Sequence, residues 1–207
     1  VVVGNVSGHG VPSALLMATA RALLRQRLSL QGDLAEAFSD VNFQLAQDVG
    51  ASGQFMTLIA LAVNPVSGVV VWVRAGHDPA ILYDPKADQF ERLTGPGVAL
   101  GVDTGSRYTL QHRSNLTEGS ILLVGTDGIW EAENQSGERF GKERLREIIR
   151  QHADAPVDEL LNAVMDAVDR FRGGCRQADD TTLVVMKQRL SSDRIVKLIP
   201  LPWRQAL

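Results

Sequence analysis

The sequence lacks several features that define large classes of protein. It has a single cysteine, Cys175, which excludes an intrachain disulfide and favours a reducing compartment, by default the cytoplasm. No signal peptide is visible in the given residues, and no apolar run approaches the ~18–20 residues that span a bilayer. Basic residues (21) do not outnumber acidic ones (24), and the net charge is near −3. We therefore expect neither a membrane-spanning segment nor a nucleic-acid partner.

Three catalytic motifs are also absent. The residue six positions after Cys175 is Thr181, so the Cys-x5-Arg motif of cysteine-dependent tyrosine phosphatases is missing. Residues 137–142 do not have the spacing of a P-loop. No set of histidines and cysteines has the spacing of a zinc site. The sequence therefore supports neither a cysteine-dependent tyrosine phosphatase, nor a P-loop protein, nor a zinc protein.

The composition suits an ordinary globular domain. A chain of 207 residues with 44% apolar and 22% charged residues can bury a sizeable core. The sequence begins inside a strand-like run at residues 1–3, so we expect a domain truncated at its N-terminus. Residues 191–207 fit no predicted element.

Apolar residues at helical spacing predict four helical segments. Asp33 is expected to cap the second helix, with Glu36 completing a capping box. The first helix is expected to have a broad apolar face that includes Leu15 and Met17. The predicted helices cover residues 12–27, 33–45, 142–151 and 156–171.

Apolar and β-branched runs between turn signals predict the strands. The helices form two groups around strands that look mainly antiparallel, which predicts an α+β layered domain. The predicted strands cover residues 1–3, 55–63, 69–75, 80–83, 107–112, 120–124 and 182–187.

Three segments that carry acidic or amide oxygens lie far apart in the chain, at residues 4–10, 125–128 and 178–182. Each one adjoins an apolar, β-branched run. Oxygen donors beside buried strands can converge on hard divalent cations, which prefer oxygen ligands. Two such cations held close together can hydrolyse phosphate esters. The first segment carries Asn5 where such a site would want a carboxylate.

Each acidic residue also has a structural interpretation. Asp127 follows an apolar strand, and Gly128 leaves room for a metal, but an exposed Asp-Gly turn is common as well. Asp179 and Asp180 precede the last strand. Because neighbouring strand residues point to opposite sides, we expect only one of them to face a metal. The alternative is a solvated cap after the long helix.

The motifs in their order along the chain resemble a known family. The motifs are Ser-Gly-His-Gly at residues 7–10 followed by Pro12, Ala-Gly-His-Asp-Pro at 75–79, Thr-Asp-Gly-Ile-Trp-Glu at 126–131 and Asp-Asp-Thr-Thr at 179–182. Together they resemble the SpoIIE-like (RsbU-type) branch of the metal-dependent protein phosphatases, the protein phosphatase 2C superfamily. The resemblance covers residues 1–188 and leaves residues 189–207 as a tail of unknown role.

The resemblance implies a fold and a reaction. The implied fold is a four-layer α-β-β-α sandwich, with two antiparallel sheets flanked by helices. The implied site is a pair of Mn²⁺ or Mg²⁺ ions that hydrolyses phosphoserine or phosphothreonine. By resemblance, its ligands are Asp127, Asp179 with Asp180 as second choice, the backbone carbonyl of Val6, and Asn5 in place of a bridging aspartate.

Asn5 is expected to impair this metal site. An amide oxygen can ligate one cation, but it brings no negative charge and bridges poorly. A unit charge 4 Å from another is worth about 4 kcal/mol at an effective dielectric of about 20. Even a third of that energy is about a tenfold loss of affinity. Two explanations stay open: an Asp→Asn change made to inactivate an enzyme, and a natural pseudo-phosphatase.

The remaining expectations concern chemistry and partners. His9 is a candidate general acid for the leaving serine oxygen. His77 is expected to order its loop.

The resemblance implies a cytoplasmic domain of bacterial signalling that follows an upstream sensor or receiver module. Its substrate would be a phosphorylated regulator such as an anti-sigma-factor antagonist, and a homodimer is compatible with the sequence. The alternative is an inactive phosphatase fold that binds a regulator without hydrolysing its phosphate.

Overall fold

The computed structural model of the chain describes residues 1–177 and 179–189. The unassigned residues 191–207 lie outside the described residues. Within these ranges the chain forms two compact units. The first unit contains residues 1–77 and 94–115, and the second contains residues 78–93 and 116–189.

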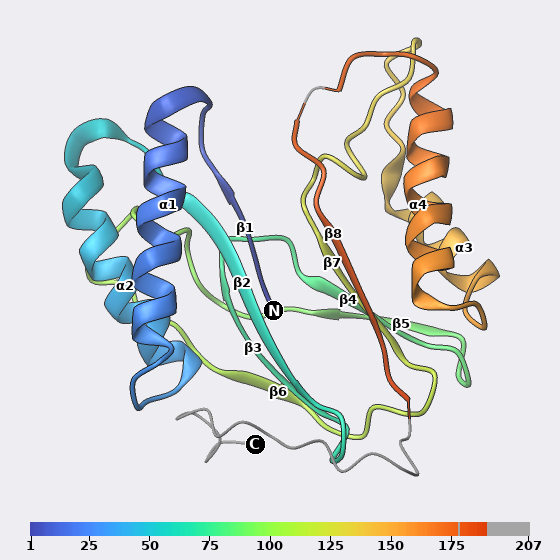
Figure 1. The fold of residues 1–207 in the computed structure, drawn as a ribbon, viewed down its shortest axis with the longest axis horizontal. Helices are drawn as coiled ribbons and strands as arrows, with labels where there is room; N and C mark the ends of the chain where they lie inside the picture. Colours follow the sequence, from blue (N-terminus) through green and yellow to red (C-terminus); the bar gives the residue numbers. More distant parts are fainter. Residues whose placement is uncertain (178, 190–207) are drawn as a thin grey trace. The chain divides into compact units, whose positions relative to one another are not determined.

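The first unit is an antiparallel sheet with two helices on one face (Figure 1). Its strands, in sheet order, are β1 (Val2–Val6), β2 (Met56–Asn64), β3 (Val69–Ala75) and β6 (Gln111–Arg113). Helices α1 (Gly10–Arg27) and α2 (Leu34–Val49) pack on each other and on this sheet, and the short 3₁₀ helix η1 (Gly50–Ser52) follows α2. Alternate residues of β2, from Met56 to Ala62, join the core formed with the helices.

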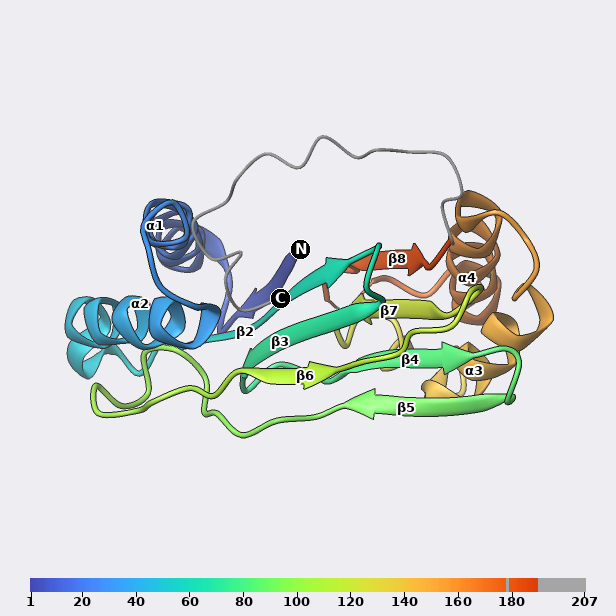
Figure 2. The same cartoon turned by 90° about the horizontal axis from the view of Figure 1, so that it is seen from below.

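The second unit repeats this plan with different elements. Its strands, in sheet order, are β5 (Gln89–Leu93), β4 (Ala80–Asp84), β7 (Ile121–Gly125) and β8 (Leu183–Lys187), and all neighbours are antiparallel. Helices α3 (Gly141–Gln151) and α4 (Val157–Arg172) pack on each other, and α4 packs on β8, as Figure 2 also shows. Ile81, Ile121 and Leu123 face these helices in the core.

The prediction of an α+β fold with two antiparallel sheets, each flanked by helices, is confirmed. The cap at the start of α2 is also confirmed, because the Asp33 carboxylate accepts a hydrogen bond from the Glu36 backbone N–H at 2.8 Å. The second half of the capping box does not form as expected. The Glu36 side chain lies 3.6 Å from Arg27 instead.

Three predictions of elements need correction. Strand β6 covers Gln111–Arg113 and not residues 107–112, because the backbone at Tyr108 turns toward α2 and donates to Ser39 Oγ at 3.3 Å. Strand β5 was not predicted, since its residues Gln89–Leu93 are mostly polar. The first strand extends to Val6 and therefore includes Asn5.

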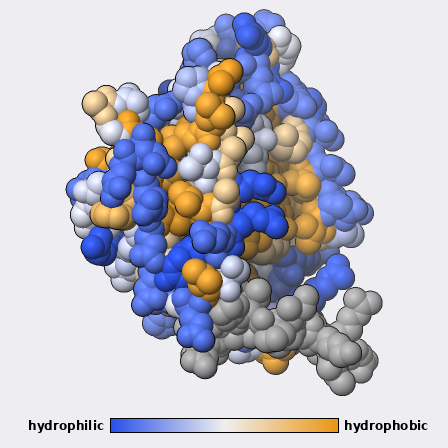
Figure 3. All heavy atoms as spheres, turned by 60° about the vertical axis from the view of Figure 1, so that its left-hand side comes forward, coloured by the Kyte–Doolittle hydropathy of each residue, from blue (hydrophilic) through white to orange (hydrophobic). Residues whose placement is uncertain are grey.

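The apolar face of α1 is narrower than predicted. Leu16, Ala20 and Leu24 are buried, but Leu15 and Met17 are 63% and 52% exposed. Figure 3 shows the side of the molecule with α1, where hydrophobic side chains interrupt a hydrophilic surface. No helix in the described ranges combines the length and the apolar character that a bilayer crossing requires.

Candidate metal centre

The loop after β7 carries Asp127 and is held tightly against the start of β8. The Thr126 N–H donates to the Thr182 carbonyl at 3.0 Å, and the Thr182 N–H donates to Thr126 Oγ1 at 2.9 Å. Thr126 Oγ1 in turn donates to the Asp180 carbonyl at 2.9 Å, and the Thr126 side chain is buried. These bonds extend the β7–β8 ladder into the two loops that carry the predicted carboxylates.

Gly128 permits the close approach of these two loops. A Cβ atom at this position would lie only 2.5 Å from the Asp180 carbonyl oxygen and 3.3 Å from that of Asp179. Real Cβ atoms do not approach backbone oxygen so closely, so only glycine fits here without moving the backbone. The missing side chain of Gly128 therefore makes room for the backbone of the neighbouring loop, and room for a metal at Gly128 stays a prediction.

Asp127 and Asp179 line the same hollow, which has a cavity volume of about 380 Å³. We call it the acid hollow. Asp180 is not among its lining residues, although its N–H donates to Asp179 Oδ1 at 2.7 Å. The structure thus brings two of the predicted side chains together and gives Asp180 a backbone role beside them.

The acid hollow also contains charged residues that the sequence reasoning missed. Glu131 and Glu133 form ion pairs with Arg139, at 2.8 and 3.7 Å. Arg172 pairs with Asp169, and Arg176 has no ion-pair partner among the described residues. The run Arg172 to Gln177 leads directly to Asp179, and this proximity was the sequence signal for a cationic rim. The complete lining is Asp127, Gly128, Glu131, Ala132, Glu133, Asn134, Arg139, Arg172, Cys175, Arg176, Gln177 and Asp179.

The remaining predicted residues belong to the first unit. Asn5 lies on β1 opposite Thr57 of β2, and its carbonyl accepts from Thr57 Oγ1 at 3.4 Å. Val6 ends the strand. His9 is the exposed N-cap residue of α1. These three residues therefore lie on one strand–turn–helix connection, within the first unit.

Backbone hydrogen bonds fix this connection to the start of β2. The Ser7 N–H donates to the Phe55 carbonyl at 2.9 Å, and the Phe55 N–H donates to Ser7 Oγ at 2.9 Å. Gly8 and Gly10 adopt positive φ angles of 80° and 78°, which suit glycine. His77 is buried, and its Nδ1 lies 3.0 Å from Thr57 Oγ1, so it anchors its own loop to β2.

The donor set of the second unit suits part of a divalent-cation site. Mg²⁺ is commonly held by one or two carboxylates while it keeps several waters. Asp127 and Asp179 provide such a pair. In the described ranges, no group of three or more His, Cys, Asp or Glu side chains is arranged to hold a metal ion. A full binuclear set would therefore need donors beyond this pair.

The fold corresponds to that of the protein phosphatase 2C class. The SiaA-PP2C domain of Pseudomonas aeruginosa has the same fold, with a TM-score of 0.77 and 24% identity over 90% of this chain and 75% of that one. The RsbU and RsbW domains of a Mycobacterium tuberculosis protein match with a TM-score of 0.73 and 24% identity, over 93% of this chain and 53% of that one.

The family profile described as "Stage II sporulation protein E (SpoIIE)" matches residues 1–189, and the chain belongs to this family. It is 23% identical to the phosphoserine phosphatase RsbU of Bacillus subtilis, over 92% of this chain and 56% of that protein. It is 25% identical to protein IcfG of Synechocystis, over 90% of this chain and 33% of that protein. The chain thus spans between a third and somewhat more than half of these relatives.

Proposed function

We propose that residues 1–188 form a metal-dependent phosphoserine/phosphothreonine protein phosphatase domain of bacterial signalling. The observation that carries the proposal is that Asp127 and Asp179 line one hollow in a chain of the SpoIIE family. Two relatives, RsbU and RsbP of Bacillus subtilis, bear the name phosphoserine phosphatase. One solved SpoIIE phosphatase domain, 17% identical, comes from a crystal soaked with manganese.

In this proposal Asp127 and Asp179 are the carboxylate ligands of Mn²⁺ or Mg²⁺. Asn5 and the Val6 carbonyl are further oxygen ligands, and Asp180 is the second choice. A bound divalent ion would supply charge neutralisation of the phosphoryl oxygens and a source of nucleophilic hydroxide. The bonds of Thr126 hold the two carboxylate loops in place before any ligand arrives. Such preorganisation is what electrostatic catalysis requires.

Other residues of the chain would bind and orient the substrate. A volume of about 380 Å³ can hold a phosphorylated side chain and part of its backbone. Arg176 lies on the rim without an ion-pair partner among the described residues, so it is suited to attract the phosphoryl group. His9 is the candidate acid that would protonate the leaving serine oxygen.

The proposed substrate is a phosphorylated regulatory protein of the anti-sigma-factor-antagonist type. The support is the similarity to RsbU over 92% of this chain. In the whole protein, a sensor or receiver module would precede this domain, and the domain would act in the cytoplasm. A homodimer is compatible with this arrangement.

The second candidate function is a pseudo-phosphatase that binds a regulator without hydrolysing it. Asn5 favours this candidate, because the resemblance implies a bridging aspartate at this position and Asn5 is a neutral amide. It predicts that the chain as it stands binds Mn²⁺ weakly and turns over p-nitrophenyl phosphate slowly.

The variant Asn5→Asp separates the two functions. If the chain is an impaired phosphatase, the added charge tightens Mn²⁺ binding in calorimetry by about tenfold or more and raises turnover of p-nitrophenyl phosphate. Asn64→Asp, at the last residue of β2, adds the same charge elsewhere in the first unit and should change neither quantity. If Asn5→Asp gains neither metal nor activity, the phosphatase proposal is wrong for this chain.

A further inference from the structure

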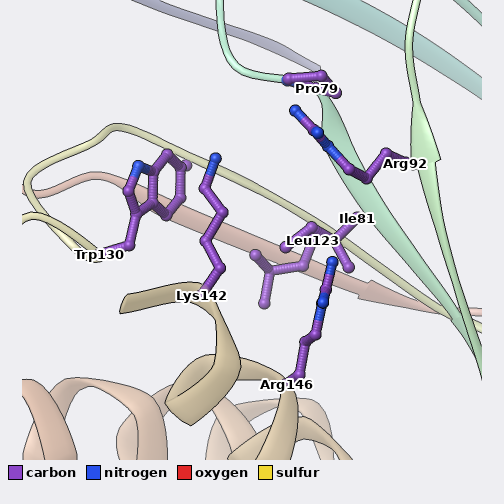
Figure 4. Close-up of a pocket in the computed structure, with 8 residues that line it drawn as sticks. Pro79, Ile81, Arg92, Leu123, Trp130, Lys142 and Arg146 are labelled. Atoms are coloured by element: carbon purple, nitrogen blue, oxygen red, sulfur yellow. The ribbon is translucent and has the colours of Figure 1, made fainter. Parts of the chain in front are cut away.

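A second hollow in the second unit is lined by three cationic side chains, Arg92, Lys142 and Arg146, beside Trp130 (Figure 4). We call it the basic hollow. It has about 310 Å³ of free space, including space open to solvent, and the described residues contribute no acidic side chain to its lining. Its cavity volume is only about 10 Å³, room for about one water-sized group.

The register of the sheet and the period of α3 bring the three cations together. Arg92 pairs with Ile81, and Ile81 pairs with Leu123, so these three side chains share the face that α3 covers. Lys142 and Arg146 are four residues apart on α3 and therefore project from the same side of the helix. Figure 4 shows the side chains from β5 and α3 reaching into the same space.

The charges of this hollow are only partly balanced. Lys142 forms an ion pair with Asp78 at 2.9 Å, and Arg146 pairs with Glu143 at 2.7 Å. Glu143 is 83% exposed, so water strongly screens the second pair. The Arg92 side chain forms no ion pair or hydrogen bond with another residue within the described part of the chain. About one positive charge therefore remains without a counter-charge.

An unsatisfied donor and two contacts with aromatic rings favour the binding of an anion in the basic hollow. Arg146 Nε is buried and forms no hydrogen bond with any described residue, so one donor lacks an acceptor. Lys142 Nζ lies 4.4 Å from the centre of the Trp130 ring, and the Arg146 guanidinium lies 5.8 Å from that of Phe90. These aromatic rings hold the long cationic side chains in place, which reduces the entropy lost when an anion binds.

We propose that the basic hollow binds a carboxylate from an acidic segment of a protein partner. Arginine donates paired hydrogen bonds to a planar carboxylate, and one carboxylate matches the single uncompensated charge. The hollow is too small to enclose a whole small molecule, but its space open to solvent admits the head of an aspartate or glutamate that reaches in from the surface. This inference depends on the basic hollow alone and not on the proposed hydrolysis.

The experiment is an NMR titration of the protein with hexaglutamate in the absence of divalent metal. The indole N–H signal of Trp130, assigned with Trp130→Phe, should shift along with the Arg92 and Arg146 Nε–H signals. Arg92→Gln should weaken the binding by about fivefold, the upper range for a partly exposed charge pair. Arg21→Gln removes the same charge from the exposed surface of α1 and should weaken it by less than about twofold.

Two results would overturn the proposal. One is an equal loss for Arg92→Gln and Arg21→Gln, because hexaglutamate would then respond only to net charge. The other is tighter binding at the same signals by a phosphoserine peptide of equal net charge, because the ligand would then be a phosphate. Since neither metal nor turnover enters the measurement, a failure here is distinct from a failure of the proposed function.

Discussion

The acid hollow and the basic hollow are both built around β7 and the loop that follows it, but they differ in charge, size and support. The acid hollow has a volume of about 380 Å³, and backbone bonds between two loops position its carboxylates. The basic hollow has a cavity volume of only about 10 Å³, and its cationic side chains come from β5 and α3. The larger hollow suits a reacting group with its ions, and the smaller one suits a docking contact.

Because backbone bonds position the charged groups of one hollow and separate side chains form the other, we expect substitutions to affect the two hollows differently. At the acid hollow, a change in backbone packing should move both carboxylates at once, because Thr126 and Gly128 join their loops. At the basic hollow, each cation comes from its own position, so a single change should remove one contact only. The four predictions below test this contrast, beginning with the largest effect.

The largest expected effect is the loss of metal binding in Asp127→Asn. In the Asn5→Asp background, this substitution should weaken Mn²⁺ binding by about 100-fold in calorimetry, since a nearby unit charge is worth about 4 kcal/mol at most in a partly wet site. Glu133→Gln removes a charge from the same hollow and should have a much smaller effect. Equal affinities of the two variants would exclude Asp127 as a ligand.

The second prediction concerns Gly128→Ala. Its Cβ would lie 2.5 Å from the Asp180 carbonyl oxygen, so the free energy of unfolding should fall by about 1–3 kcal/mol. Urea denaturation measures this change. Gly105→Ala is the control, because its Cβ would lie no closer than 3.6 Å to Asp103. Similar stabilities of the two variants would show that the loops are not packed as described.

The third prediction concerns the net positive charge of the basic hollow. Asp78→Asn removes the counter-charge of Lys142, so hexaglutamate should bind up to about fivefold more tightly in the NMR titration. Asp154→Asn changes the net charge equally at an exposed position and should change the affinity less. An unchanged affinity in Asp78→Asn would mean that Lys142 does not contribute to binding.

The smallest expected effect is a pH dependence beside the basic hollow. The hydrogen bond from Arg150 lowers the pKa of the exposed Asp88 carboxyl, and one from the Tyr83 hydroxyl assists. A lowered folded-state pKa contributes stability above the unfolded pKa of about 3.9, and this stability is lost as the pH falls through the folded value.

The urea midpoints of the protein and of Asp88→Asn measure this effect. The midpoint of the protein minus that of Asp88→Asn should be constant near pH 6. It should decrease as the pH falls from about 4 to 2, because the ionised Asp88 then loses its contribution to stability. The pH dependence of the difference tests the role of Arg150, whereas its absolute size does not. Asparagine also suits the positive φ of 49° at this position, so the substitution can change stability at every pH. A difference that stays constant down to pH 2 would contradict the role of Arg150.

Much of the fold could be predicted from local patterns. The Asp33 cap and the apolar stripes predicted all four helices, and the β-branched runs predicted the central strands β2, β3 and β7 and the edge strand β8. These runs are buried or half-buried in the folded chain, so packing favours the same extended conformation as their β-branched residues do. The exposed Leu15 and Met17 show where composition alone overestimates a buried face.

Strand β5 could not be predicted, and Arg92 was missed with it. Only Phe90 and Leu93 of this strand are apolar, and its register comes from pairing with β4. The cation spacing on α3 was visible in the sequence, but its partner strand was not. For the acid hollow, the sequence predicted Asp127 and Asp179 but not the Thr126 bonds that hold their loops together.

The most direct test of the account is Mn²⁺-induced broadening of backbone amide signals, recorded with and without Asn5→Asp. Paired oxygen donors at the acid hollow predict that the first signals to broaden are those of Asp127, Gly128 and Asp179, at lower Mn²⁺ concentration in the variant. The Arg92 and Arg146 signals should broaden later. Broadening that begins at other residues, or that leaves Asp127 and Asp179 sharp, would contradict the metal centre.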